Sequence, residues 1–201
     1  METPVFQLVE IFSSLQGEGR NMGRPCVFVR FAGCNLSCPW CDTDIAPRFS
    51  LDHAALLAEI AAHRERSVIL TGGEPTRVKG IGPLVADLKR LGYWVAVETN
   101  GTTALDEAPW LGQLDYVACS PKAEFPESLR LTRADEVRVV ASSAAAVAFC
   151  RALKGRIAAT DCYVSPCDRG GEIDFATAKE VLSQLEGWSL SVQLHKILGF
   201  R

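Results

Sequence analysis

The chain has 201 residues, of which 48% are hydrophobic and 22% charged, and its formal net charge is -3. This size suits one domain with a substantial core, and the charge gives no basic field to attract nucleic acid. No apolar run approaches the roughly 20 residues of a membrane span. Met1 to Val5 lack the basic and apolar regions of a signal peptide, so we expect a cytoplasmic protein.

Short apolar runs rich in Val and Ile alternate with helical patterns along the chain. Asp52 and Ser142 are placed to cap two of the helices, and Gly92 is placed to end another. In chain order, the sequence predicts strand 27–31, helix 54–63, strand 68–70, helix 83–91, strand 93–97, strand 116–119, strand 137–140, helix 144–153, strand 162–164, helix 175–185 and a closing strand 190–194.

Strands separated by helices of about ten to fifteen residues indicate parallel βαβ units. About six such units fit, fewer than a complete eight-fold barrel contains, which takes ~250 residues. We therefore expect an α/β fold, a partial (β/α)6-type barrel in full or abridged form, that forms a single domain over residues 1–201. Chemically active side chains follow the strands, at the carboxyl ends where such sheets bind ligands.

Three of the eight cysteines, Cys34, Cys38 and Cys41, are clustered at C-x₃-C-x₂-C spacing within the loop 33–43. An all-protein [4Fe–4S] site takes four cysteines, so three thiolates leave one iron open to a small molecule. The chain length and the uneven clustering argue against a disulfide framework. The cysteines that we expect to be buried, from their apolar surroundings, are Cys26, Cys119, Cys150 and Cys162.

The cysteine loop resembles that of the radical S-adenosylmethionine (SAM) superfamily. Trp40 matches the aromatic residue that this family places near the adenine, and Gly72-Gly73-Glu74 resembles the motif that meets the methionine amino group. Glycines let the backbone approach a ligand and a carboxylate accepts an ammonium hydrogen bond, although Gly-Gly-Glu-Pro is also a good turn. The resemblance implies a [4Fe–4S] cluster whose open iron binds SAM and cleaves it to a 5′-deoxyadenosyl radical.

A narrower resemblance, over most of the chain, is to the 7-carboxy-7-deazaguanine synthases of queuosine and 7-deazapurine biosynthesis. It implies a lyase that converts 6-carboxy-5,6,7,8-tetrahydropterin to 7-carboxy-7-deazaguanine with loss of ammonia, by hydrogen abstraction at C6 and with Mg²⁺. It also implies a homodimer and a flavodoxin-like reductant. The segments that carry it are 12–19 (FSSLQGEG), 23–36 (GRPCVFVRFAGCNL), 41–43 (CDT), 98–102 (ETNGT), 120–122 (SPK) and 193–196 (QLHK).

The resemblance assigns residues to the metal and to SAM. Thr43 matches the family's magnesium ligand, and a hydroxyl oxygen suits hard Mg²⁺, although Cys-Asp-Thr by itself is a turn. Loop 165–168 occupies the place of a SAM-binding loop, with Ser165 where the family usually has Gln, and Cys167 in it has no assigned role. The implied SAM contacts are Trp40, Cys41, Asp42, Gly72, Gly73, Glu74, Ser120, Pro121, Lys122, Ser165 and Asp168.

The substrate contacts rest partly on chemistry. A guanidinium binds a carboxylate bidentately, which suits Arg30, although an Arg that ends an apolar strand is more often an ion-pair partner. Gln16 offers amide donors and acceptors to the pterin edge, and its alternative is a turn residue in a glycine-rich segment. The family resemblance adds the chain-terminal carboxylate of Arg201, where the family has Pro. The predicted substrate contacts are Leu15, Gln16, Gly17, Arg30, Thr71, His195 and Arg201.

Two other functions stay open at this point. A glycyl-radical activating enzyme would share the three cysteines and the Gly-Gly-Glu motif, but segment 16–18, Arg30 and Thr43 argue against it. A non-enzymatic zinc or iron–sulfur module is the second alternative, and zinc would want a fourth protein ligand.

Overall fold

The computed structural model of the chain describes residues 4–200, and in this range one ten-stranded sheet runs through the molecule. Most of its strands alternate with helices along the chain, as the sequence predicts. The strands are β1 (Val5–Leu15), β2 (Pro25–Phe31), β3 (Phe49–Asp52), β4 (Ser67–Gly72), β5 (Trp94–Thr99), β6 (Tyr116–Cys119), β7 (Glu136–Ala141), β8 (Asp161–Asp168), β9 (Ile173–Asp174) and β10 (Ser189–Leu190).

The helices lie between these strands. Asp52 caps the first helix as predicted, because its side chain accepts a hydrogen bond from the backbone N–H of Ala55. The α-helices are α1 (His53–Ala61), α2 (Ile81–Arg90), α3 (Ala146–Leu153), α4 (Phe175–Leu182) and α5 (Leu194–Leu198), and the 3₁₀ turns are η1 (Gly19–Asn21), η2 (Pro75–Arg77), η3 (Pro109–Gln113) and η4 (Pro126–Ser128).

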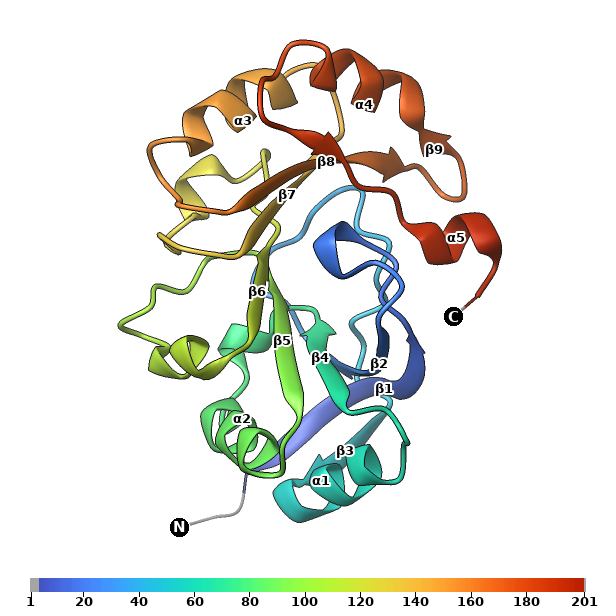
Figure 1. Cartoon of the computed structure of the whole chain (residues 1–201), viewed down its shortest axis with the longest axis vertical. Coiled ribbons are helices and arrows are strands. Elements are labelled where there is room, and N and C mark those ends of the chain that lie inside the picture. Colours follow the sequence, from blue (N-terminus) through green and yellow to red (C-terminus); the bar gives the residue numbers. More distant parts are fainter. Residues whose placement is uncertain (1–3, 201) are drawn as a thin grey trace.

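The sheet order is β10-β8-β7-β6-β5-β4-β2-β1-β3, with β9 paired to β8. Strands β2, β4, β5, β6, β7, β8 and β10 pair in parallel, whereas β1 and β3 are antiparallel additions at one side of the sheet. The sheet curves around an open interior, and α1 to α4 lie on its outer side (Figure 1). Within the described residues, six longer parallel strands in a curved, unclosed sheet confirm the predicted α/β partial barrel.

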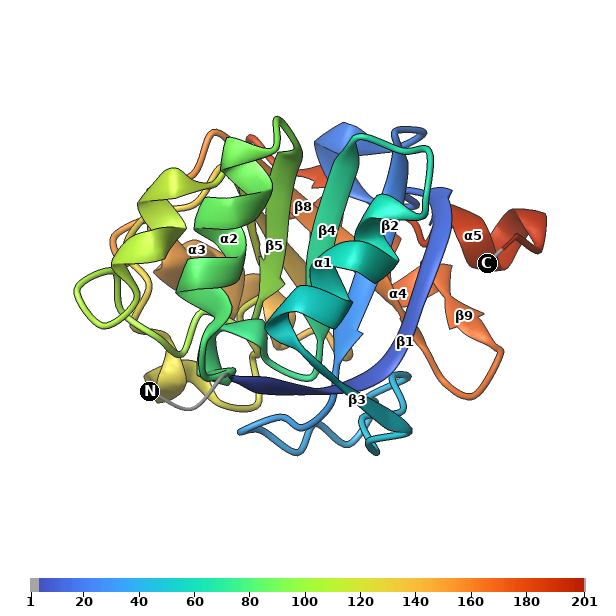
Figure 2. The same ribbon diagram turned by 90° about the horizontal axis from the view of Figure 1, so that it is seen from below.

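Two apolar layers follow from the alternation of side chains along the strands. The larger layer lies between the sheet and the outer helices, where Val27 and Val29 of β2 pack with Leu56 of α1 and Leu84 of α2. Figure 2 shows α1 and α2 lying across β4 and β5. The intervening residues face the interior and form a smaller cluster, which consists of Cys26, Phe28, Ile69, Ala96, Tyr116 and Ala118.

The sequence missed the antiparallel strands β1 and β3. Strand β1 alternates buried and exposed residues only at its start, and its pairing with β2 is irregular between Leu8 and Glu10. Polar residues such as Gln7 and Ser13 interrupt its apolar pattern because the strand lies at the side of the sheet. An antiparallel strand can leave one face to solvent, so it lacks the continuous apolar run of the central parallel strands, which are buried on both faces.

Three further expectations were wrong. Helix α3 begins at Ala146 after Ala145, so Ser142 is not its cap, and the Ser142 hydroxyl instead donates to Glu124. Segment 165–168 is part of β8 rather than a loop, because it pairs with β7 and then with β9, and Cys167 in it is buried. The closing strand is only Ser189–Leu190, and Leu194 instead begins α5.

Candidate active site

A cavity of about 650 Å³ opens on the concave side of the sheet. Its walls combine the ends of the parallel strands with the cysteine loop 33–43, the segment after β1 and the C-terminal helix α5. The fold thus gathers residues from the whole length of the chain. The predicted site residues that line the cavity are Leu15, Gln16, Gly17, Arg30, Cys34, Cys38, Trp40, Cys41, Asp42, Thr43, Thr71, Gly72, Gly73, Ser120, Lys122, Ser165, Asp168 and His195.

Two predicted residues do not line the cavity. Glu74 is 1% exposed and lies behind the cavity wall, and Pro121 is buried between Ser120 and Lys122. Arg201 lies outside the described residues.

The three clustered cysteines carry free thiols on the loop that lines the cavity. Cys34 and Cys41 are exposed, and Cys38 is half-buried, which raises the pKa of its thiol. Within residues 4–200, no three His, Cys, Asp or Glu side chains converge closely enough to bind a single ion. A [4Fe–4S] cluster binds each thiolate to a separate iron, so three accessible thiols on one loop suit it without such convergence.

The cysteine loop is fastened to the end of β4 through backbone contacts. The N–H of Glu74 donates to the carbonyl of Gly33 at 3.0 Å, and the N–H of Gly33 donates to Ile45 at 2.9 Å. A Cβ atom at Gly73 would overlap the Gly33 carbonyl oxygen, so this close approach requires glycine. The Gly-Gly-Glu segment therefore sets the position of the loop that carries the thiols.

Glu74 connects two strand ends. Its Oε1 accepts hydrogen bonds from the Thr76 hydroxyl and the Thr99 hydroxyl, both at 2.7 Å, and its Oε2 accepts from the backbone N–H of Asn100 at 2.7 Å. A carboxylate buried this deeply needs such donors, because an unpaired one would be costly. The carboxylate thus ties the end of β4 to the end of β5.

Trp40 is held on two sides. Its indole N–H donates to Glu124 at 2.6 Å, and the ammonium of Lys122 lies 5.2 Å from the ring centroid. Lys122 also donates to the hydroxyl of Ser120 at 2.9 Å. A cation over an aromatic face is attracted by the ring electrons. The contacts connect the cysteine loop to the segment after β6, which lines the same cavity.

The C-terminal helix α5 is attached to the cysteine loop by Lys196. Its ammonium lies 2.5 Å from carboxylate oxygens of both Asp42 and Asp168, and Gln193 donates to Asp42 at 3.1 Å. Hydrogen bonding to Lys196 holds the pKa of Asp168 below its usual value. The neighbouring Thr43 hydroxyl donates to Asp42 at 3.3 Å. This group closes one side of the cavity.

His195 reaches the segment after β1. A Cβ atom at Gly17 would stand 2.5 Å from its Nδ1, and the N–H of Leu194 donates to the carbonyl of Gly17 at 3.0 Å. Burial is the main cause that lowers the pKa of His195 below its ordinary value, which favours the neutral imidazole at neutral pH. Helix α5 therefore brings an uncharged ring to the cavity.

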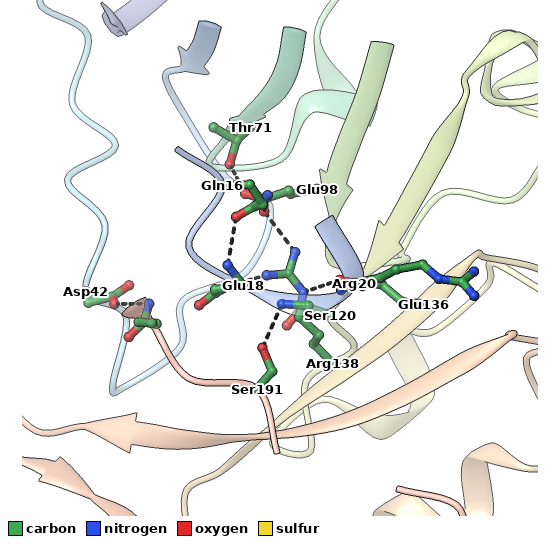
Figure 3. Close-up of polar contacts among 12 residues, drawn as sticks. Gln16, Glu18, Arg20, Asp42, Thr71, Glu98, Ser120, Glu136, Arg138 and Ser191 are labelled. Carbon is green, nitrogen blue, oxygen red and sulfur yellow. Dashed lines mark hydrogen bonds and ion pairs between the residues drawn. The ribbon is translucent and has the colours of Figure 1, made fainter. Parts of the chain in front are cut away.

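The predicted substrate side of the cavity is a polar network around Glu98 (Figure 3). Gln16 donates to one Glu98 oxygen at 3.1 Å, and Thr71 donates to the other at 2.8 Å. Arg30 lines the cavity nearby and pairs through Nε with Glu10 at 2.8 Å. Arg30 therefore forms the ion pair that the sequence left open as an alternative, and it also lines the cavity.

Sequence reasoning missed Glu18, Glu98 and Arg138, which line the same cavity. Glu98 belongs to a recognised motif and comes directly after the predicted strand 93–97, so its position was a usable signal. Arg138 is the one charged residue within the apolar run 137–140, and a charge in such a run was a second signal. Glu18 lies in the glycine-rich segment, where polar residues are common and carry little information.

Comparison with protein-family models matches residues 28–157 to the radical SAM superfamily. The matched segment begins in β2 and ends after α3, so it includes the cysteine loop, the cavity-lining ends of β4, β5 and β7, and the segment after β6.

Curated relatives extend the likeness to almost the whole chain. A 7-carboxy-7-deazaguanine synthase of Haemophilus influenzae is 40% identical, with 98% of this chain and 94% of the relative covered. One of Neisseria meningitidis is 41% identical, with 98% and 95% covered. Among solved structures, QueE from Escherichia coli superposes with a TM-score of 0.73 at 23% identity, covering 95% of each chain, which shows the shared fold.

Proposed function

Because the chain belongs to the radical SAM superfamily and, within it, to the 7-carboxy-7-deazaguanine synthases, we propose that it converts 6-carboxy-5,6,7,8-tetrahydropterin to 7-carboxy-7-deazaguanine with loss of ammonia. The chain is thus a lyase of 7-deazapurine biosynthesis. One observation carries the substrate assignment: the three cysteines share a cavity with a guanidinium, an amide and hydroxyl groups, which are donors suited to a carboxylated pterin. The relatives' shared name favours this reading over the glycyl-radical and zinc alternatives.

Family membership implies a [4Fe–4S] cluster and SAM, and we assign Cys34, Cys38 and Cys41 to the cluster. When bound, the cluster and SAM supply the one-electron chemistry that begins hydrogen abstraction. The chain's own contribution is to present three thiols on a loop that Gly33 and Gly73 hold in place and that lines the cavity.

SAM would occupy the part of the cavity next to the cysteine loop. The backbone of Gly72 and Gly73 permits close approach there, and Lys122 offers a cation to a carboxylate. Trp40 provides an aromatic face that Glu124 and Lys122 orient. Glu74 remains a proposed SAM contact. Its carboxylate oxygens would accept a hydrogen bond from SAM in addition to those from Thr99 and Asn100. The other proposed SAM contacts are Cys41, Asp42, Ser120, Pro121, Ser165 and Asp168.

The pterin acid would bind on the opposite side, near Glu98. Arg30 is the proposed partner of the substrate carboxylate, and its pairing with Glu10 through Nε supports a fixed guanidinium orientation. Gln16 and Thr71 add an amide and a hydroxyl that are already oriented by Glu98. The remaining proposed contacts are Leu15, Gly17, His195 and the terminal carboxylate of Arg201.

We propose Thr43 as the protein ligand of Mg²⁺. Thr43 lines the cavity at the end of the cysteine loop and donates its hydroxyl to Asp42, so a hard oxygen donor is available there. Mg²⁺ commonly binds few protein ligands and completes its shell with water and substrate oxygens. The substrate carboxylate would then share the metal with Thr43.

The proposal extends to partners that resemblance to the family suggests. A flavodoxin-like protein would supply electrons, and two copies of the chain would form a homodimer. Exposed Ile197 and Leu198 on α5 are apolar side chains that such an interface could cover. The eight free thiols are compatible with the reducing cytoplasm, where we place the enzyme. In the part of the chain that the structure describes, no helix is long and apolar enough to cross a membrane.

Anaerobic reconstitution with iron and sulfide, followed by incubation with SAM, a reductant and the pterin acid, tests the function. We expect about four irons per chain and a product with the mass of the carboxydeazaguanine. Cys38→Ala should lose turnover, whereas Cys162→Ala, which changes a half-buried thiol outside the cavity lining, should retain it. Unchanged turnover by Cys38→Ala would reject the cluster assignment, and product-free wild-type enzyme with a full cluster would reject the substrate.

A further inference from the structure

Arg138 is a buried cation in the cavity lining, and its side chain is 5% exposed. It extends from β7 toward three glutamates that come from different parts of the chain. We propose that Arg138 is a positioning residue, which fixes the carboxylates of Glu18 and Glu98 in the cavity wall so that they are preorganised for the substrate. This inference rests on the proposed function and adds a residue to its machinery.

The contacts of the guanidinium separate two kinds of glutamate. The terminal nitrogens bind the two cavity-lining residues: one donates to Glu18 and the other donates to Glu98 at 2.8 Å. Nε lies 2.8 Å from Glu136, but without the geometry of a hydrogen bond. Both terminal nitrogens of the guanidinium, which form a planar fork of two donors, thus donate to carboxylates of cavity-lining residues (Figure 3).

Glu136 has other donors. The Tyr116 hydroxyl donates to it at 2.7 Å, and the backbone N–H of Arg20 donates at 3.0 Å. Because these donors come from β6 and from η1, Glu136 is held from several sides. A purely structural Arg138 would be expected to serve this most deeply buried carboxylate best, yet its hydrogen bonds go to the other two glutamates.

Glu98 is fixed by three donors from three segments. Gln16 of the segment after β1, Thr71 of β4 and Arg138 of β7 each donate to it. Arg138 thus fixes the carboxylate from the β7 side, opposite the β4 contact. Groups held in this way need no reorganisation when a ligand binds, which is how buried dipoles and charges contribute most to a site.

The charge balance also gives Arg138 a role that a neutral residue could not fill. One guanidinium faces the three carboxylates Glu18, Glu98 and Glu136, and the side chain of Arg20 pairs instead with Asp161. Burial lowers the pKa of Arg138 to about 10, which still leaves it charged at neutral pH. The charged and titratable groups around it are Glu18, Arg20, Glu98, Tyr116, Glu136, Asp161 and Tyr163.

Arg138→Lys is the decisive variant, because it keeps the charge and removes the fork. A single ammonium cannot reproduce two directed donors to two carboxylates. We expect KM for the pterin acid to rise about tenfold or more, while iron content and KM for SAM stay unchanged. Arg20→Lys is the matched control, since Arg20 is a half-exposed ion-pair partner, and it should leave both KM values unchanged.

A double-mutant cycle with Glu98→Gln separates positioning from a general loss of stability. If Arg138 acts through Glu98, the KM of the double variant for the pterin acid should be little higher than that of the more impaired single variant. The inference would be overturned if the effects of the two single variants on KM for the pterin acid were additive in free energy, or if the KM values for the pterin acid and for SAM rose equally. So would an Arg138→Lys enzyme with wild-type kinetics.

A second arm remains informative should Arg138→Lys fold poorly. Arg138→Ala leaves a buried gap that free guanidinium can fill. Guanidinium at millimolar concentration should therefore restore binding of the oxidised form of the substrate, 6-carboxypterin, measured by calorimetry. Ammonium at the same concentration should not. Folded Arg138→Ala enzyme that binds the pterin acid normally without guanidinium would refute the inference. A wild-type enzyme that neither binds nor converts the pterin acid would instead refute the proposed function itself, whatever the variants do.

Discussion

The hydroxyl of Thr43 lies on the cavity wall two residues after the last clustered cysteine and donates to Asp42 at 3.3 Å. Asp42 in turn accepts from Lys196 and Gln193, so its charge is already shared with α5. At this position the oxygen, rather than the shape of the side chain, is the feature that a hard cation would use.

This gives a residue-scale prediction. Thr43→Ala should raise the Mg²⁺ concentration for half-maximal activity by at least about tenfold, because even partners outside the metal's own ligands change affinity that much. Thr43→Ser keeps the hydroxyl and should respond to Mg²⁺ as the wild type does. The measurement is turnover against Mg²⁺ concentration, and identical curves for the Ala and wild-type enzymes would reject Thr43 as the ligand.

At the scale of elements, the cysteine loop depends on the end of β4. The Gly72–Glu74 segment approaches Gly33 so closely that their backbones are in contact, and Glu74 extends the connection to β5. Since loops are usually the most mobile parts of a fold, such fixation matters for three thiols that must bind one cluster.

Gly73→Ala tests this contact. The added methyl group overlaps the Gly33 carbonyl, so we expect a loss of about 1–3 kcal/mol in the free energy of unfolding of the cluster-free protein and reduced iron retention. Gly112→Ala in η3 meets nothing within 4 Å and should change stability by no more than about 0.5 kcal/mol. Denaturant unfolding of both variants is the measurement, and equal stabilities would show that the β4 end does not constrain the loop.

At the scale of the whole molecule, the cavity has no separate domain of its own. Its walls come from strands of one continuous sheet, from β1 near one side to β8 near the other, and the outer core extends from α1 to α4. We therefore propose that residues 1–201 form a single folding unit, since neither half of the sheet could bury its faces alone.

If the chain is a single folding unit, it should unfold in one cooperative transition. Leu70→Ala in β4 and Leu153→Ala in α3 remove buried side chains at distant sites, and each should lower the stability of the cluster-free protein by about 2–5 kcal/mol. Both should shift one common transition followed by circular dichroism and tryptophan fluorescence. Leu91→Ala, at a position 53% exposed, serves as the control. Two separate transitions, each moved by one variant only, would contradict a single unit.

The sequence by itself determined the central strands and the identity of the chemistry. Parallel strands such as β4 and β5 are buried on both faces, so their apolar runs are visible without any partner. Cys34, Cys38 and Cys41 are close in sequence, and a local spacing is readable because no folding is needed to bring the thiols together.

Only the tertiary structure decided what depends on distant pairing. Strand β1 has a weak apolar pattern because its antiparallel pairing with β2 and β3 stabilises it, and Leu194 begins a helix because α5 docks on Gly17 and Asp42. The meeting of Arg138 with Glu18 and Glu98 joins residues 120 and 40 positions apart. The sequence states which charged side chains are present, but these side chains come close enough to bind one another only after the sheet has curved.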